Sequence, residues 1–242
     1  MKKMDPRVSI LDRRLCEVGR IIAVTGGKGG VGKSLITAAL GLNLSRLGFR
    51  VALLDLDLTS PSLHIILGAD DIFPEEEKGI IPPEVAGVKL MSIIYFTARN
   101  PSPLRGPDIS NATLELLANT IWGEIDFLMV DMPPGVGDVM MDIIRWMRGS
   151  EFLIVSNPSK LVLETVIKVI RLLTELDLPI LGVIENMKRG ERSSWEKLSG
   201  FGIPFLGELP YFEDLEDAVG DPEMLLSSGF GRRLGEIAAG LI

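Results

Sequence analysis

The first residues able to do chemistry lie near the start of the chain, where residues 27–34 read GKGGVGKS. This is the spacing of a Walker A phosphate-binding loop, and the apolar run IIAVT before it and the helical pattern after it are the setting that the motif requires. Glycines let backbone N–H groups converge on phosphate oxygens, and the start of a helix adds partial positive charge. We therefore expect Lys33 to hold the β and γ phosphates of a nucleotide and the Ser34 hydroxyl to bind Mg²⁺.

Two further apolar runs end in carboxylates that would complete such a site. The run LLDLD ends at Asp57, with Asp55 two residues earlier, and the run FLMVD ends at Asp131. Ligands of open parallel sheets bind outside the carboxyl ends of the strands, so these groups should lie beside the phosphate loop. We expect Asp57 to orient the attacking water, and Asp55 and Asp131 to reach the metal through its hydration shell. The alternative for Asp55 or Asp57 is a cap on a helix that starts after residues 60–62.

Later loops offer the remaining contacts to a nucleotide. Asp131 is followed by MPPGVGD, in which Gly135 can bring its N–H close to the γ phosphate as part of a switch. Asn186, in GVIENMK, can bond a purine edge, and Arg189 stands where a guanine-specific loop carries an Asp, so adenine is favoured. Pro210 is placed to pack on the base, although a simple turn proline is an equally good interpretation.

These chemical groups require a scaffold of alternating strands and helices. Short, nearly continuous apolar runs occur at residues 21–25, 51–54, 127–130, 152–155 and 180–184, with further strand patterns at 88–95 and 205–209. Such strands are covered on both faces, as in a parallel sheet. Helical spacing follows at 33–47, 109–122, 161–176 and 231–241, whereas 73–87 and 99–108 are typical of surface loops. We predict a doubly wound, mostly parallel α/β sheet of about seven or eight strands flanked by helices, the fold of P-loop NTPases.

Composition limits the functions open to the chain. Its 242 residues suit one core, and no apolar run is long enough to span a membrane, so a soluble, cytoplasmic protein without stable membrane insertion is expected. The net charge of −8 disfavours nucleic acid as a partner. The single cysteine, Cys16, cannot alone supply the thiolates of a zinc or iron–sulfur site.

The chain is expected to divide into a short N-terminal segment, residues 1–19, and one ATPase domain, residues 20–242. In the segment, Val8, Leu11, Leu15 and Val18 recur at helical spacing and line one face. That face could dock a partner or pack on its own domain.

From residue 20 to about residue 240, the motifs together resemble the Mrp/MinD family of ATPases, whose phosphate loop has a deviant Walker A pattern. The resemblance is carried by KGGVGKS, LLDLDLTSPS, the RGP at 105–107, WGEIDFLMVDMPPGVGD, GVIENM and GIPFLGELP. It implies a homodimer that sandwiches ATP, in which Lys28 crosses the two-fold axis to touch the partner's nucleotide. It also implies work on metallocentre assembly, with Lys28, Lys33 and Asp57 as catalytic residues and ATP or ADP and Mg²⁺ as cofactors. The nucleotide contacts would be Gly27, Gly29, Gly30, Val31, Gly32, Lys33, Ser34, Leu35, Gly135, Asn186 and Pro210, and the metal contacts Ser34, Asp55 and Asp131.

One departure from the family pattern guides the functional interpretation. Iron–sulfur carriers of the family place a Cys-x-x-Cys after the ENM motif, but here that stretch reads KRGERSSWEKLSGFG. The chain thus resembles the cysteine-free members that assist nickel insertion into [NiFe] hydrogenase, which implies a nickel metallochaperone or hydrogenase-maturation partner. The alternatives are an iron–sulfur cluster carrier and a membrane-cycling spatial regulator of the MinD type. The regulator would need a basic amphipathic tail, whereas GRRLGEIAAGLI has only a weak apolar face.

Overall fold

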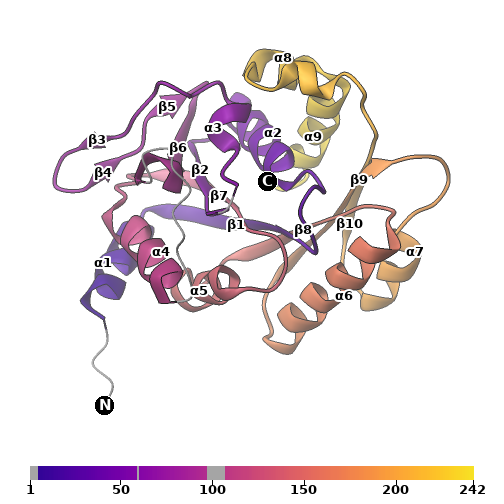
Figure 1. Ribbon diagram of the computed structural model, residues 1–242, viewed down its shortest axis with the longest axis horizontal. Coiled ribbons are helices and arrows are strands. Elements are labelled where there is room, and N and C mark those ends of the chain that lie inside the picture. The colour runs from indigo at the N-terminus through magenta and orange to yellow at the C-terminus, as the bar shows by residue number, and fades with distance from the viewer. Residues whose placement is uncertain (1–4, 59, 97–106) are drawn as a thin grey trace.

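The computed structural model describes residues 5–58, 60–96 and 107–242, so Arg105 and Gly106 of the RGP motif lie outside the described part. Its centre is an eight-stranded sheet (Figure 1). The strands are β1 (Val18–Gly26), β2 (Val51–Asp55), β5 (Glu84–Val85), β6 (Val88–Ser92), β7 (Ile125–Asp131), β8 (Glu151–Ser156), β9 (Ile180–Lys188) and β10 (Phe205–Pro210). They lie in the order β10-β9-β8-β1-β7-β2-β6-β5, and every neighbouring pair is parallel except β5 with β6. This confirms the predicted doubly wound, mostly parallel α/β fold.

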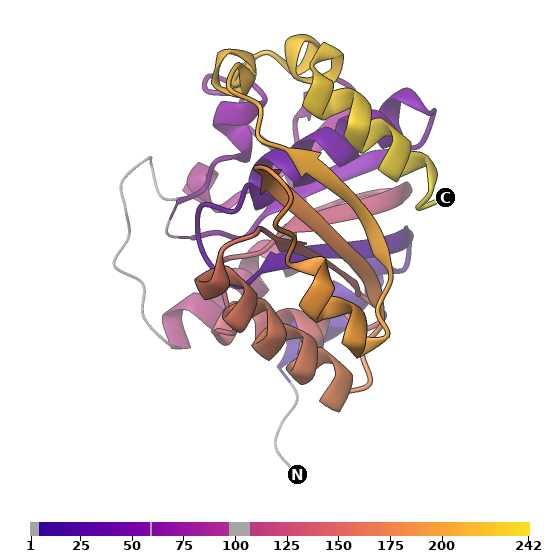
Figure 2. The ribbon, with the colours of Figure 1, turned by 90° about the vertical axis from the view of Figure 1, so that its right-hand side faces the viewer.

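Helices cover both faces of the sheet (Figure 2). One layer holds α2 (Lys33–Arg46), α8 (Pro222–Ser227) and α9 (Gly229–Ala239), and the other holds α1 (Pro6–Leu15), α4 (Pro107–Asn119), α5 (Asp138–Trp146) and α6 (Lys160–Glu175). Shorter elements are α3 (Leu63–Ile66), α7 (Trp195–Leu198) and the 3₁₀ turns η1 (Ile93–Phe96), η2 (Ser199–Phe201) and η3 (Leu215–Ala218). Two helix layers explain why the central strands are apolar on both faces: every residue of β2, for example, is buried.

The order of the strands indicates where on the sheet a ligand would bind. β1 lies in the middle, between β7 and β8, and the chain continues from β1 to β2 on one side and later to β8 and β9 on the other. The strand order therefore reverses beside β1, and ligands of such sheets bind at the carboxyl end of the strands at this point. β1 ends at Gly26 and α2 begins at Lys33, so the glycine-rich loop occupies this position.

The C-terminal helix completes the core. α9 contacts α2, and its apolar residues Phe230, Leu234, Ile237 and Ala238 are buried. Its apolar face is thus covered by the protein itself. Across the described residues, no helix is both long enough and apolar enough to cross a bilayer.

The N-terminal helix also packs inward. Leu11 is completely buried, and Val8 and Leu15 are partly buried against the same core. The helix contacts α4, and the Asp5 side chain caps its start by accepting a hydrogen bond from the Arg7 N–H. The apolar stripe seen in the sequence therefore lies against its own domain.

Residues 73–87 are more ordered than the surface loop that their composition predicts. They contain β3 (Glu75–Glu76) and β4 (Ile80–Ile81), which form an antiparallel pair, followed by β5 on β6. Strands of two residues are too short to show a periodic pattern, and this is why the sequence did not reveal them.

Neighbouring residues of α1 provide a test of this packing. Leu11→Ala should lower the free energy of unfolding by about 2 to 5 kcal/mol, because it removes a fully buried side chain and leaves a cavity. Ile10→Ala is the matched control: Ile10 is 40% exposed, and its loss should change the stability by about 0.5 kcal/mol or less. Urea unfolding of both variants measures the difference. If Leu11→Ala lowered the free energy of unfolding as little as Ile10→Ala does, α1 would not be part of the core.

Candidate functional site

The glycine-rich loop has the geometry of an anion-binding turn. Gly32, at the N-cap of α2, has a φ of +87°, a left-handed conformation that a residue with a Cβ rarely adopts. In the described structure no side chain caps this helix, so its first N–H groups face the loop without a side-chain acceptor. The Lys33 side chain is buried and folds back over the end of β1, where its Cδ would lie 3.3 Å from a Cβ placed on Gly26. Backbone donors and an ammonium group therefore converge on the same volume.

A cavity of about 430 Å³ lies at this loop. It is lined by Gly29, Gly30, Gly32, Lys33, Ser34, Leu35, Asp57, Ser60, Ser62, Ile66, Pro134 and Val219. The structure thus brings seven of the predicted site residues together in one cavity. Ser60 and Ser62 were missed, although two hydroxyls directly after the LLDLD strand were a usable signal. Val219 belongs to a distant segment, and the sequence offers no signal that places it here.

Asp131 lies at the end of β7, beside the loop. Both of its carboxylate oxygens are buried and lack a hydrogen bond of normal geometry from a described residue. The pKa of Asp131 is raised to about 6, chiefly by burial; the Ser34 hydroxyl, the Lys33 ammonium and the Thr37 hydroxyl lower it, and the charge of Asp57 raises it. A buried carboxylate with unfilled oxygens beside an ammonium and a hydroxyl is suited to a hydrated divalent cation.

Asp55 is held differently. It stands opposite Asp131 in the register of β2 and β7, and it is completely buried. Its carboxylate accepts N–H bonds from Asp57 (3.1 Å), Ser62 (2.9 Å) and Leu63 (3.1 Å). Burial and, after it, the charge of Asp131 raise the pKa of Asp55 to about 7. In this arrangement Asp55 organises the turn that carries Asp57 and bonds to the first N–H groups of α3, as in the capping role that the sequence offered as its alternative.

Asp57 is the carboxylate that lines the cavity. Its Oδ1 accepts a hydrogen bond of 3.2 Å from the Ser60 N–H, so the side chain caps the turn as well as facing the phosphate loop. The sequence offered a site residue or a helix cap; the structure places Asp57 in the cavity lining and at a turn before α3, and its role in the site remains a prediction.

Two glycines fasten neighbouring elements to the loop. A Cβ on Gly27 would lie 2.1 Å from Thr165 Oγ1, so α6 packs directly on the loop. The Gly135 N–H donates a 2.9 Å hydrogen bond to the Gly26 carbonyl. We predicted that this N–H would face the γ phosphate, but the structure instead places it on the end of β1. Lys28, between these contacts, is exposed and forms no ion pair with a described residue.

The predicted base-binding residues do not line the cavity. The Asn186 side chain is buried, and its Nδ2 donates a 2.9 Å hydrogen bond to the Val31 carbonyl of the phosphate loop. Pro210 is exposed at the end of β10, next to Lys188 in the register of the sheet. The Arg189 guanidinium stacks on the ring of Tyr211 at 3.7 Å. In this structure Asn186 braces the loop rather than facing open space, and the base-contact roles of Asn186 and Pro210 remain predictions.

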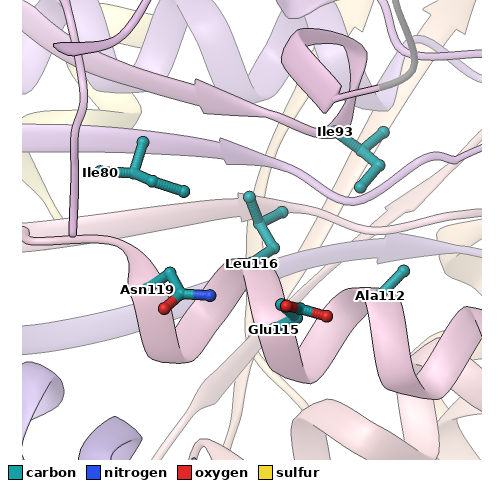
Figure 3. A pocket seen from close by; sticks show the side chains of 6 residues that line it. All are labelled: Ile80, Ile93, Ala112, Glu115, Leu116 and Asn119. Carbon is teal, nitrogen blue, oxygen red and sulfur yellow. The ribbon is translucent and has the colours of Figure 1, made fainter. Parts of the chain in front are cut away.

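A second pocket is chemically different. It has a volume of about 330 Å³ and lies between β4, η1 and α4, where Ile80, Ile93, Ala112 and Leu116 surround it together with Glu115 and Asn119 (Figure 3). Its described lining residues include none of those of the first cavity and no cationic side chain. They are mostly apolar and differ in chemistry from the phosphate loop.

Potential metal ligands of the protein itself are few. In residues 5–58, 60–96 and 107–242, no three or more His, Cys, Asp or Glu side chains form a group that could hold a metal ion. Cys16 is exposed at the end of α1, and its Sγ donates to the Arg13 carbonyl at 3.0 Å. The metal suited to the cavity is therefore one that arrives with phosphate oxygens as additional ligands, as Mg²⁺ does with a nucleotide.

A phosphate loop between β1 and α2, with carboxylates at the ends of the two strands beyond it, defines this protein as a P-loop NTPase. The family profile described as "ParA: NUBPL iron-transfer P-loop NTPase" matches residues 17–199, and the chain belongs to this family. An iron-sulfur cluster carrier protein from Pseudomonas fragi is 33% identical over 251 residues, covering 90% of this chain and 88% of the relative. The Fe-S cluster assembly factor HCF101 of Arabidopsis thaliana chloroplasts is 38% identical over 210 residues, and these residues span 81% of this chain but only 39% of HCF101.

Solved structures agree with the fold. A nucleotide-binding protein from Archaeoglobus fulgidus, solved in complex with ADP, superimposes with a TM-score of 0.77 at 28% identity, covering 93% of this chain and 95% of that protein. The cell division ATPase MinD from Pyrococcus furiosus superimposes with a TM-score of 0.68 at 23% identity, covering 92% and 98% of the two chains, and supports the fold alone.

These relatives correct the functional interpretation of the sequence. We expected nickel insertion into hydrogenase with a nickel metallochaperone as partner, and this is wrong: the matching family is described by iron transfer, and the relatives are named for iron–sulfur clusters. A single missing Cys-x-x-Cys is weaker evidence than a resemblance that extends over most of the chain. The alternative of an iron–sulfur function is better supported.

The buried charge of Asp131 leads to a stability test. Asp131→Asn should raise the free energy of unfolding of the nucleotide-free protein by about 1 to 3 kcal/mol at about pH 8, because it removes a charge that burial disfavours. The folded protein raises the pKa of this carboxyl from 3.8 to about 6. The destabilising effect of its ionisation is therefore absent below about pH 4, grows as the pH rises, and reaches its full size above about pH 6. The gain should therefore vanish near pH 4. Urea unfolding in EDTA at both pH values measures it, and a gain independent of pH would contradict this assignment.

Proposed function

We propose that this chain is a Mg-ATP hydrolase that acts as a homodimeric switch in iron–sulfur cluster assembly. The observation that carries the proposal is the convergence of Lys33, Ser34 and Asp57 on one cavity, with Asp131 buried beside it. Lys33 and the loop N–H groups would hold the β and γ phosphates. The Ser34 hydroxyl, and Asp131 through water, would hold Mg²⁺, which neutralises phosphate charge when bound.

Asp57 is suited to orient the attacking water. It lines the cavity, and its hydrogen bond from Ser60 fixes the carboxylate on a short turn. Phosphoryl transfer depends mainly on positioning and electrostatic stabilisation, so a strong base is not required. Slow turnover follows, because the described cavity lining offers no dedicated strong base to activate the water.

A face suited to dimerisation surrounds Lys28. Val136 is 49% exposed on the turn whose Gly135 bonds to Gly26, and Leu161 is 67% exposed in the first turn of α6, whose Thr165 abuts Gly27. An exposed lysine flanked by exposed apolar side chains fits a two-fold interface in which each subunit gives Lys28 to the other's nucleotide. A cation delivered in this way acts like an arginine finger.

The iron–sulfur assignment rests on the relatives. The position of the cysteine indicates which protein would hold the cluster. Cys16 precedes β1, whereas the phosphate loop follows it, and the nine residues of β1 separate the two by about 30 Å. Two subunits joined at their phosphate loops would therefore keep both Cys16 side chains far from the shared interface. We infer that the cluster is cargo whose thiolate ligands come from a partner protein.

Two lysine variants test the nucleotide roles. Lys33→Ala should weaken Mg-ADP binding by about 10- to 100-fold, because a charge-assisted contact is lost. Lys28→Ala should leave binding unchanged and slow hydrolysis by about 10³-fold. Calorimetry and phosphate release measure these effects, and Lys168→Ala, an exposed lysine of α6, is the control.

Mixing the two variants tests delivery of Lys28 across the interface. Each is inactive for a different reason, and a mixed dimer pairs an intact Lys28 with an intact Lys33. Hydrolysis should partly recover on mixing. If hydrolysis does not recover on mixing, Lys28 is not delivered across the interface. If Lys28→Ala alone hydrolyses ATP as fast as the wild type at the same protein concentration, Lys28 has no catalytic role at all.

The cargo hypothesis is tested by anaerobic incubation with ferrous iron and sulfide, followed by gel filtration. The wild type and Cys16→Ser should both elute without a visible cluster absorption band. Tagged protein purified anaerobically with ATP from its own cells should instead carry a partner that contains iron and sulfide in matching amounts, and Lys33→Ala should not. A stable band on the isolated chain would contradict a cluster held by partner thiolates, and any other metal on the partner would reject the iron–sulfur role.

A further inference from the structure

Glu185 is a buried carboxylate that nucleotide chemistry does not use. It lies in β9, is 0% exposed, and stands between Ser156 of β8 and Glu208 of β10 in the register of the sheet. Burying a carboxylate is costly unless hydrogen bonds satisfy its oxygens. The hydrogen-bond partners of Glu185 therefore indicate its structural role.

Its partners come from the segment that follows β9. Glu185 accepts hydrogen bonds from the Ser193 hydroxyl (2.7 Å), the Ser194 hydroxyl (2.6 Å) and the Ser194 N–H. The Ser193 hydroxyl also accepts from the Trp195 N–H at 3.1 Å, and Trp195 stacks on Phe205 of β10 at 4.8 Å. One carboxylate thus ties Ser193 and Ser194, at the end of the segment 189–194, to the sheet.

The two residues after Glu185 contact the phosphate loop. Asn186 donates to the Val31 carbonyl, and its Nδ2 would be 2.3 Å from a Cβ on Gly32. The Met187 Cε would lie 3.7 Å from the same Cβ. Met187 has a φ of +56°, a conformation that a non-glycine residue keeps only where its surroundings enforce it. The backbone here is therefore constrained by the loop on one side and by the following segment on the other.

Strand geometry connects these two sets of contacts. Successive side chains of a strand point to opposite faces, so fixing Glu185 on one face also sets the direction of Asn186 on the other. We infer that Glu185 is a positioning residue that couples the conformation of residues 189–194 to the phosphate loop through Asn186 and Met187. Occupation of the loop by a nucleotide would then alter the exposed segment, and a change in the segment would alter nucleotide affinity.

Residues 189–194 are well placed to transmit such a signal. Arg189 and Arg192 are exposed, and neither forms an ion pair with a described carboxylate. The inference depends on nucleotide binding at the loop, as proposed above, but not on the nature of the cargo.

Hydrogen exchange with and without Mg-ADP tests the coupling. In the wild type, Mg-ADP should slow amide exchange both in the phosphate loop and in residues 189–194. Glu185→Gln keeps the shape of the side chain but replaces one acceptor oxygen with a donor. It should remove the response of residues 189–194 and weaken Mg-ADP binding by about three- to tenfold. Glu191→Gln makes the same charge change on an exposed residue of the same segment and should behave as the wild type.

Two further variants keep the test decisive if Glu185→Gln does not fold. Ser193→Ala/Ser194→Ala removes the hydroxyl donors and should reproduce its effects. Asn186→Ala breaks the contact with Val31 and should leave residues 189–194 protected but unresponsive to Mg-ADP. Coupling is rejected if residues 189–194 of the wild type ignore Mg-ADP, or if the variants bind and respond as the wild type does. A wild type that binds no nucleotide would instead reject the proposed ATPase function.

Discussion

Two carboxylates buried side by side are the constraint on which this site depends. Asp55 and Asp131 are opposite each other on adjacent strands, and both are completely buried. Burial disfavours the charge of each and raises both pKa values; the charge of Asp131 raises the pKa of Asp55 further, and the charge of Asp57 adds to the rise at Asp131. Such an arrangement is stable only with compensating donors or cations. The local structure divides these between the two residues.

Asp55 is compensated by the backbone, and Asp131 is not. Three N–H groups of the turn after β2 bond to Asp55, which holds Asp57 and Ser62 at the edge of the cavity. Among the described residues, Asp131 has the Lys33 ammonium and the Ser34 and Thr37 hydroxyls to offset its charge. A hydrated magnesium ion accompanied by phosphates would supply the missing positive charge. The empty site therefore contains a buried negative charge that is not fully compensated. A bound Mg-nucleotide would compensate this charge, so its binding would also stabilise the fold.

Sequence alone predicted the parts of the site whose chemistry is local. The glycine spacing identified the loop, and apolar runs ending in Asp identified the strand ends, because both signals lie within a few consecutive residues. It failed where function depends on contacts between distant segments. The bond from Gly135 to Gly26 and the bond from Asn186 to Val31 join residues more than a hundred positions apart, and a motif cannot show which backbone group its side chain will meet. The same limit applies to β3, β4 and β5, whose pairing depends on partners rather than on periodicity.

The segment after the ENM motif contains no cysteine, but it has defined contacts of its own. Ser193 and Ser194 engage a buried carboxylate, and the neighbouring Trp195 packs on β10. These contacts hold the end of β9, whose Asn186 bonds to the Val31 carbonyl of the phosphate loop. A stretch that lacks an expected motif can therefore still have a structural role that only the contacts reveal.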